Sequence, residues 1–261
     1  NKAALRAGGI IFGSARLAVQ ANPTPTSSGC VYCGMCLHGC PYGVIYNAAS
    51  TLQELQRNLN FRYIQNVIVR KIKEPGGGIR ILAESRQDGR PLQYSGDRVY
   101  LAGCVLPTTR ILLDSLEAYD HPLSMRYSQY FLLPLLRYRS VPSVREESLH
   151  TLAQIFLEMY DEALSEHTIH LQVYTYNDLY LGFMRRLLNL AFPLMKMPVD
   201  ALLGRLLIIQ GYLHSNLSPT ISLKLQAVEK RVSNQLILEA TPAGDAKRVI
   251  RGTVRTLFRH R

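Results

Sequence analysis

The sequence predicts an α+β protein whose sheet is mostly antiparallel and is covered by helices. Three observations indicate this class. Hydrophobic residues make up 47% and charged residues 19% of the 261 residues, as in globular proteins that bury a sizeable core. Apolar residues that alternate with a period of two, which is typical of strands, dominate the second half of the chain. Apolar runs with helical spacing interrupt these strands and follow them.

The first 117 residues are expected to contain three helices, a β-meander and one more strand. Residues 1–20 and 47–59 carry apolar residues at helical spacing. Three period-two segments, separated by glycine-rich turns, predict the meander. They are residues 62–72, 79–83 and 92–94. A short apolar strand is predicted at residues 98–102, followed by a helix that begins at Thr108 or Thr109.

From residue 118 on, strands dominate the prediction. Six segments read as strands: residues 127–138, 152–160, 169–176, 206–214, 220–226 and 235–240. The clearest alternation places Ile169, Leu171, Val173 and Thr175 on one face and His170, Gln172, Tyr174 and Tyr176 on the other. A strongly apolar helix is predicted at residues 179–194, and a C-terminal helix is predicted from Gly244.

The chain is basic, with a net charge of +11 from 30 Lys and Arg against 19 Asp and Glu. These residues are scattered except near the C-terminus, where Lys247–Arg261 is interpreted as a solvated helix face. A dense basic patch interleaved with aromatic residues is missing from the sequence, so no nucleic-acid partner is predicted. Residues 179–203 are rich in Leu and Met and carry basic residues, which leaves peripheral membrane contact open beside packing on the sheet.

Four of the five cysteines fall within eleven residues. Cys30, Cys33, Cys36 and Cys40, followed by Pro41, have the spacing of ferredoxin-type iron–sulfur segments. Thiolates this close together on an irregular loop can converge on one inorganic core. Glycines between them allow backbone N–H groups to point at the sulfurs. We therefore predict an iron–sulfur cluster, either 4Fe–4S or 3Fe–4S. Either three of the cysteines and one further group are the ligands, or a three-iron cluster leaves one of the four thiols spare.

Other interpretations of the cysteines and histidines remain open. The four cysteines could hold zinc, form disulfides or stay free. His38 is expected to face solvent, and Cys104 is expected to pack in the interior unless it is a remote ligand. His170 and His214 are expected to be hydrogen-bonded structural residues. The aromatic residues Tyr160, Tyr174 and Tyr176 are expected in the core, although they could stack on a sugar.

Residues 29–43, followed by Tyr46-Asn47, resemble the cysteine segment of glucose–methanol–choline (GMC) oxidoreductases. The resemblance is to the bacterial branch that also holds an iron–sulfur cluster, such as FAD-dependent sugar dehydrogenases. Residues 66–72 resemble the strand that contacts the FAD adenine, with Val69 at the contact. Residues 97–113 resemble the second flavin signature through Ala102 and Gly103, with Thr109 where proline is usual.

The resemblance implies that residues 1–117 are the middle portion of a Rossmann-like FAD-binding domain and residues 118–261 a substrate-binding domain. Val69, Ala102, Gly103 and Asn47 would contact FAD, and the four cysteines would hold the cluster. The implied reaction oxidises an alcohol or sugar, passes hydride to FAD, and sends electrons through the cluster to an external acceptor such as a cytochrome or a quinone.

Two parts of the family pattern are missing: the Gly-x-Gly-x-x-Gly motif and the catalytic histidine segment. We therefore expect this chain to be the middle of a longer polypeptide, with its catalytic residues elsewhere, and to be catalytically incomplete alone. The alternative function is a non-flavin iron–sulfur or zinc-binding module for electron transfer or structure.

Overall fold

The computed structural model describes residues 9–228, 234–242 and 245–259, which form a mixed α/β structure with antiparallel sheets. The chain divides into two compact units, each assembled from segments that are distant in sequence. The first unit comprises Asn1–Leu52, Tyr127–Ser218 and Ala243–Arg261, and the second comprises Gln53–Arg126 and Pro219–Pro242. The domain boundary predicted after residue 117 falls inside the second unit and stays a prediction.

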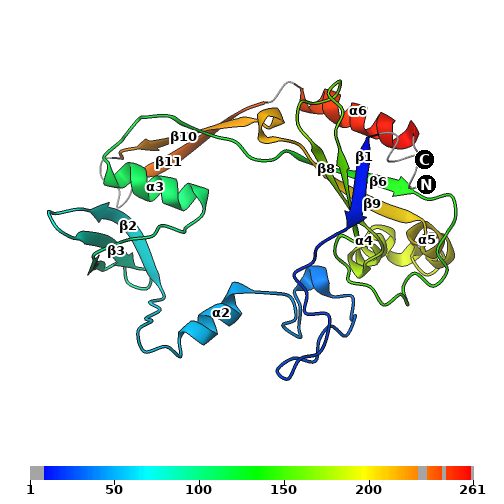
Figure 1. The fold of residues 1–261 in the computed structure, drawn as a ribbon, viewed down its shortest axis with the longest axis horizontal. Helices are drawn as coiled ribbons and strands as arrows, with labels where there is room; N and C mark the ends of the chain where they lie inside the picture. Colours follow the sequence, from blue (N-terminus) through cyan, green and yellow to red (C-terminus); the bar gives the residue numbers. More distant parts are fainter. Residues whose placement is uncertain (1–8, 229–233, 243–244, 260–261) are drawn as a thin grey trace. The chain divides into compact units, whose positions relative to one another are not determined.

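A five-stranded sheet forms the centre of the first unit (Figure 1). Its strands, in spatial order, are β1 (Ile10–Ser14), β7 (Ile155–Met159), β8 (Ile169–Tyr174), β9 (Leu206–Tyr212) and β6 (Tyr130–Leu136). Every neighbouring pair is antiparallel. The prediction of a mostly antiparallel sheet is therefore confirmed, including the four strands that it placed in this part of the chain.

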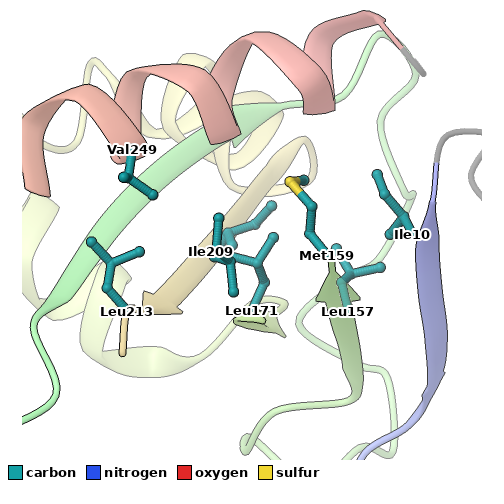
Figure 2. Close-up of a cluster of buried hydrophobic side chains, with 8 residues drawn as sticks. Ile10, Leu157, Met159, Leu171, Ile209, Leu213 and Val249 are labelled. Carbon is teal, nitrogen blue, oxygen red and sulfur yellow. The ribbon is translucent and has the colours of Figure 1, made fainter. Parts of the chain in front are cut away.

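The C-terminal helix α6 (Ala246–Arg259) packs on this sheet through an apolar stripe. Figure 2 shows Val249 of α6 among side chains from the strands, including Met159, Leu171 and Ile209. Leu171 and Val249 are fully buried. Because successive residues of a strand point to opposite faces, burial of Ile169 and Leu171 confirms the predicted alternation in β8.

Two helices separate β8 from β9: α4 (Asp178–Leu188) and α5 (Lys196–Leu203), joined through the 3-10 turn η2 (Asn189–Ala191). Asn177 caps α4, since its side chain accepts a hydrogen bond from the N–H of Leu179 at 3.0 Å. A second small core lies between α4 and α5. Its buried members are Leu181, Val199 and Leu203. No helix in the described ranges is both long and apolar enough to cross a membrane.

The second unit contains two three-stranded antiparallel sheets and a helix. One sheet is the predicted meander: β2 (Val67–Lys73), β3 (Ile79–Ser85) and β4 (Pro91–Gly96). The other orders its strands as β11 (Gln235–Thr241), β10 (Thr220–Gln226) and β5 (Leu123–Met125). The helix α3 (Val105–Ser115) packs beside β2. The short helix α2 (Ala48–Leu55) confirms the helix predicted at residues 47–59.

Two local predictions are wrong. The sequence predicts a helix at residues 1–20, but residues 10–14 form the strand β1. The apolar Ile10 and Phe12 pair with residues of β7, and the hydrogen bonds of this ladder satisfy the backbone groups of β1. Residues 1–8 lie outside the described ranges. The strand predicted at residues 98–102 is a loop, and α3 begins earlier than predicted, at Val105. Pro107 then falls in the first turn, where its missing N–H costs no hydrogen bond.

Candidate metal centre

The cysteine segment is a loop whose two ends are tied together in the first unit. Val19 and Ile45 form an isolated antiparallel bridge. The N–H of Gln20 donates to the carbonyl of Val44 at 2.7 Å, and the N–H of Tyr46 donates to the carbonyl of Ala18 at 3.3 Å. Between these ties the chain has little regular structure apart from the 3-10 turn η1 (Cys36–His38). The short ladder therefore fixes where the loop starts and returns.

Gly29 allows the backbone at the start of the cysteine segment to pack directly against the backbone of residues 21–23. Gly29 is buried and has a φ of +70°. A Cβ there would lie 2.7 Å from the carbonyl carbon of Asn22 and 2.8 Å from the nitrogen of Pro23. The N–H of Cys30 then donates to the carbonyl of Ala21 at 3.2 Å. Only glycine fits this turn, and the turn aims Cys30 into the loop.

All four cysteines of the segment line one narrow pocket with a volume of about 10 Å³. The remaining lining residues are apolar or aromatic: Val19, Val31, Met35, Tyr42, Val44 and Ile45. Cys30, Cys36 and Cys40 are partly buried, and Cys33 is exposed. The loop thus places the four predicted ligands around one narrow pocket, although Cys33 and several of the apolar lining residues are also exposed at the surface.

Backbone N–H groups point at two of these sulfurs. The N–H of Tyr32 donates to the Sγ of Cys30 at 3.4 Å. Burial raises the pKa of the Cys40 thiol, but N–H groups of residues 42–45 oppose this effect, and the net result is a pKa below the ordinary thiol value. Hydrogen bonds to sulfur favour the thiolate, which is the form that binds metals.

A distant segment, just before β7, contacts the cysteine loop. Nδ1 of His150 lies 3.5 Å from the Sγ of Cys30, and the His150 ring stacks on Tyr32 with centroids 5.0 Å apart. The hydroxyl of Thr151 donates to the carbonyl of Gly34 at 2.9 Å. Sequence reasoning missed His150, because it is an isolated histidine 120 residues from Cys30. No spacing pattern could have linked the two.

In the described part of the chain, no three His, Cys, Asp or Glu side chains approach closely enough to hold a single metal ion. All five cysteines are free thiols there. His38 is exposed on η1, as predicted. Cys104 belongs to the second unit, where it precedes α3. Its predicted burial is wrong: its side chain is exposed, because the loop turns at a φ of +62° and presents it to solvent.

The residues predicted to contact FAD are divided between the units. Asn47 belongs to the first unit, where its side chain caps α2 by accepting a hydrogen bond from the N–H of Ala49 at 2.9 Å. Val69 belongs to the second unit and lies at a β-bulge of β2, beside an open hollow that Pro107 and Arg110 also line. Ala102 and Gly103 are exposed in the loop before α3.

A hydrogen-bonded chain of polar side chains runs across the face of the five-stranded sheet opposite α6. Nδ1 of His170 lies 2.6 Å from Oε1 of Glu158, its cross-strand neighbour. Nε2 of His170 lies 3.4 Å from Nε2 of Gln172, and the hydroxyl of Tyr174 donates to Oε1 of Gln172 at 2.9 Å. His170 is thus hydrogen-bonded, as predicted.

The other predicted histidine and aromatic residues lie elsewhere in the first unit. His214 accepts a hydrogen bond from the N–H of Asn216 and stacks on His167, with ring centroids 3.5 Å apart. Tyr160 is exposed, so its predicted core position is wrong; its hydroxyl reaches out to Glu162 at 2.9 Å. Tyr176 is half-buried, and burial together with its hydrogen bond to Asp178 raises its pKa to about 12.

Comparisons with known proteins find no family model that matches this sequence and no curated protein that matches it significantly.

Proposed function

We propose that Cys30, Cys33, Cys36 and Cys40 hold an iron–sulfur cluster, and that the chain is part of an FAD-dependent oxidoreductase acting on the CH–OH groups of alcohols or sugars. One observation carries the proposal: four thiols with ferredoxin-type spacing line a single narrow pocket with otherwise apolar walls. The flavin and the substrate class come from the resemblance of the cysteine segment and of residues 66–113 to GMC oxidoreductases.

The residues around this pocket match an iron–sulfur site in three respects, but the loop must widen to admit a cluster, because the pocket measures only about 10 Å³. The four sulfurs are on one loop, backbone N–H groups donate to Cys30 and Cys40, and the other lining side chains are apolar or aromatic. Donors to the sulfurs and exclusion of solvent are the factors by which proteins set cluster potentials. A bound cluster supplies one-electron transfer, and the chain's own part is to bind it, shield it and donate these hydrogen bonds.

The described residues do not by themselves form a flavin site. All strand pairs described here are antiparallel, whereas a dinucleotide-binding fold needs parallel strands joined through a glycine-rich turn. Val69 and Arg110 line an open hollow that could meet part of a nucleotide.

The cluster assignment is tested by purifying the 261-residue chain under anaerobic conditions and measuring iron, acid-labile sulfide and zinc per chain. We expect iron and sulfide in comparable amounts and an EPR signal after reduction or oxidation. Cys36→Ala should lose most of the iron, whereas Cys104→Ala, a control in the second unit, should retain it. Stoichiometric zinc without sulfide, or iron that survives Cys36→Ala unchanged, would contradict the assignment.

A second candidate, a non-flavin iron–sulfur or zinc module, is favoured by the antiparallel pairing of all the described strands. Flavin analysis separates the two candidates. The protein purified from its native source should carry one FAD per chain if the oxidoreductase proposal is correct. A cluster without any flavin in that protein would favour the module.

A further inference from the structure

The helical segment between β8 and β9 has two apolar faces, but only one of them is buried. On α4, Leu181, Met184 and Leu188 turn toward the small core with α5. Leu179, Phe183 and Leu187 are spaced four residues apart and are exposed, and Phe183 and Leu187 reach 64% and 66% exposure. Residues four apart lie on one face of a helix, so these three form an apolar stripe directed away from the core.

The stripe continues past the end of α4. Leu190, Leu194 and Met197 are 89%, 87% and 83% exposed. Together with Met195, which is 41% exposed, seven large apolar side chains are therefore exposed within one segment of nineteen positions, residues 179–197. We call these seven residues, namely Leu179, Phe183, Leu187, Leu190, Leu194, Met195 and Met197, the apolar ridge. Scattered single apolar residues are normal on a protein surface, whereas a contiguous group marks a binding surface.

The charges on this segment indicate what covers the ridge. Residues 179–197 contain Arg185, Arg186 and Lys196 and no acidic residue, and all three basic residues are exposed. The acidic residues that flank the segment have partners. Asp178 accepts a hydrogen bond from the hydroxyl of Tyr176 at 2.6 Å, and Asp200 pairs with Arg145 at 3.1 Å.

We propose that the apolar ridge docks on an anionic lipid surface, with its leucines, Phe183 and Met197 entering the acyl boundary and Arg186 and Lys196 contacting the head groups. Apolar side chains flanked by Lys or Arg are the composition of helices that lie in a membrane interface. In Figure 1, α4 and α5 lie side by side at one end of the first unit. This inference is independent of the cysteine loop and of the proposed redox function.

The chain contains no tryptophan, which permits a sharp test with a single reporter. Leu190→Trp places an indole on the ridge, and Leu59→Trp places one at a fully exposed leucine of the second unit. With vesicles of phosphatidylcholine and phosphatidylglycerol, the emission of the Leu190→Trp chain should shift to the blue. The emission of the Leu59→Trp chain should not shift. Equal behaviour of the two reporters would overturn the proposal.

Co-sedimentation with the same vesicles measures separately the contribution of the apolar side chains and that of the basic side chains to binding. Phe183→Ser and Leu187→Ser should each weaken binding by about tenfold, because each removes a large apolar side chain from the interface. Leu59→Ser is the matched control and should bind as the wild type does. The pair Arg186→Gln and Lys196→Gln should weaken binding to anionic vesicles by about fivefold per charge. It should leave binding to phosphatidylcholine vesicles unchanged.

Two further results would overturn the membrane assignment. One is a wild-type chain that fails to sediment with anionic vesicles. The other is a wild-type dimer, detected by light scattering without lipid, that dissociates in the Phe183→Ser chain, because the ridge would then be covered by a second copy. All the substituted side chains are exposed, so circular dichroism should confirm an unchanged fold in each variant.

Discussion

Replacing Gly29 with alanine tests whether the cysteine loop depends on one close approach between backbone segments. At Gly29, with a φ of +70°, a Cβ would meet backbone atoms of residues 21–23 at 2.7–2.8 Å. Gly43, in the same loop, has a φ of +66°, but a Cβ there would meet no described atom within 4 Å. The two substitutions therefore impose nearly the same conformational strain, and only Gly29→Ala adds a collision.

The expected magnitudes follow from these two contributions. An alanine in the left-handed region costs about 1–2 kcal/mol at either position. At Gly29 the backbone must also move apart, which breaks the hydrogen bond from Cys30 to Ala21 and adds about 1 kcal/mol or more. In proteins of this size each 1 kcal/mol lowers the Tm by about 2–4 °C. We expect Gly29→Ala to lower the Tm by roughly 4–12 °C and Gly43→Ala by roughly 2–8 °C, so that the collision accounts for a difference of about 2–4 °C or more between the two variants.

Thermal unfolding followed by circular dichroism measures both variants, and iron content per chain reports the state of the loop. Gly29→Ala should lose iron as well as stability, since its collision displaces Cys30, while Gly43→Ala should keep most of its iron. Equal losses of Tm in the two variants would refute the argument, because the collision would then contribute nothing beyond the backbone strain.

Three further predictions concern a donor, an ion pair and the core. His150→Phe keeps an aromatic ring but removes the nitrogen beside Cys30. Potentiometry of the cluster followed by EPR should show a midpoint potential about 59 mV lower, which corresponds to about a tenfold smaller ratio of reduced to oxidised cluster. His150→Asn should restore part of the shift, and equal midpoints in the wild type and His150→Phe would contradict this role. A hydrogen bond from Arg70 outweighs the effect of partial burial and holds the pKa of Glu84 below its ordinary value. The Arg70–Glu84 pair therefore stabilises the fold fully above the ordinary pKa of a glutamate, and this stabilisation is lost as the pH falls through the lowered pKa. Urea unfolding of Glu84→Gln should therefore depend less on pH than the wild type between about pH 5 and 3, and an unchanged profile would contradict the assignment. Leu171→Ala, at a fully buried position of β8, should cost about 2–5 kcal/mol in urea unfolding, and a loss below 1 kcal/mol would show that the core collapses around it.

The strands of the first unit could be predicted because they carry their own periodicity. In β8, buried Ile169 and Leu171 alternate with His170 and Gln172, so the sequence itself separates the two faces. The sequence did not predict the pairing of β1 with β7, because that contact joins residues about 145 positions apart, such as Ile10 and Met159. When the partner strand is not known, the apolar residues of a short segment fit the spacing of a helix as well as that of a strand.

The candidate metal centre likewise has one part that the sequence predicts and another that it does not. Its four cysteines could be found from the sequence, because their spacing along the chain limits how far apart the sulfurs can lie in space. Its support could not be found, since His150 and Thr151 reach the loop only after the chain has returned to form β7. The ridge on α4 was visible as a Leu- and Met-rich segment, but only the packing shows which of its apolar residues stay exposed.

Residues just before β7 help to stabilise the cysteine loop. The loop has one short 3-10 turn and two isolated bridges, Val19–Ile45 and Thr24–Ser27, so its shape also depends on contacts made by residues just before β7. The side-chain amide of Gln154 donates to the carbonyls of His150 and Leu152, which fixes that segment at the point where the sheet begins. Damage to the sheet core should therefore reach the cysteines through residues 150–154. For that reason a core substitution far from any thiol is expected to lower iron content together with stability.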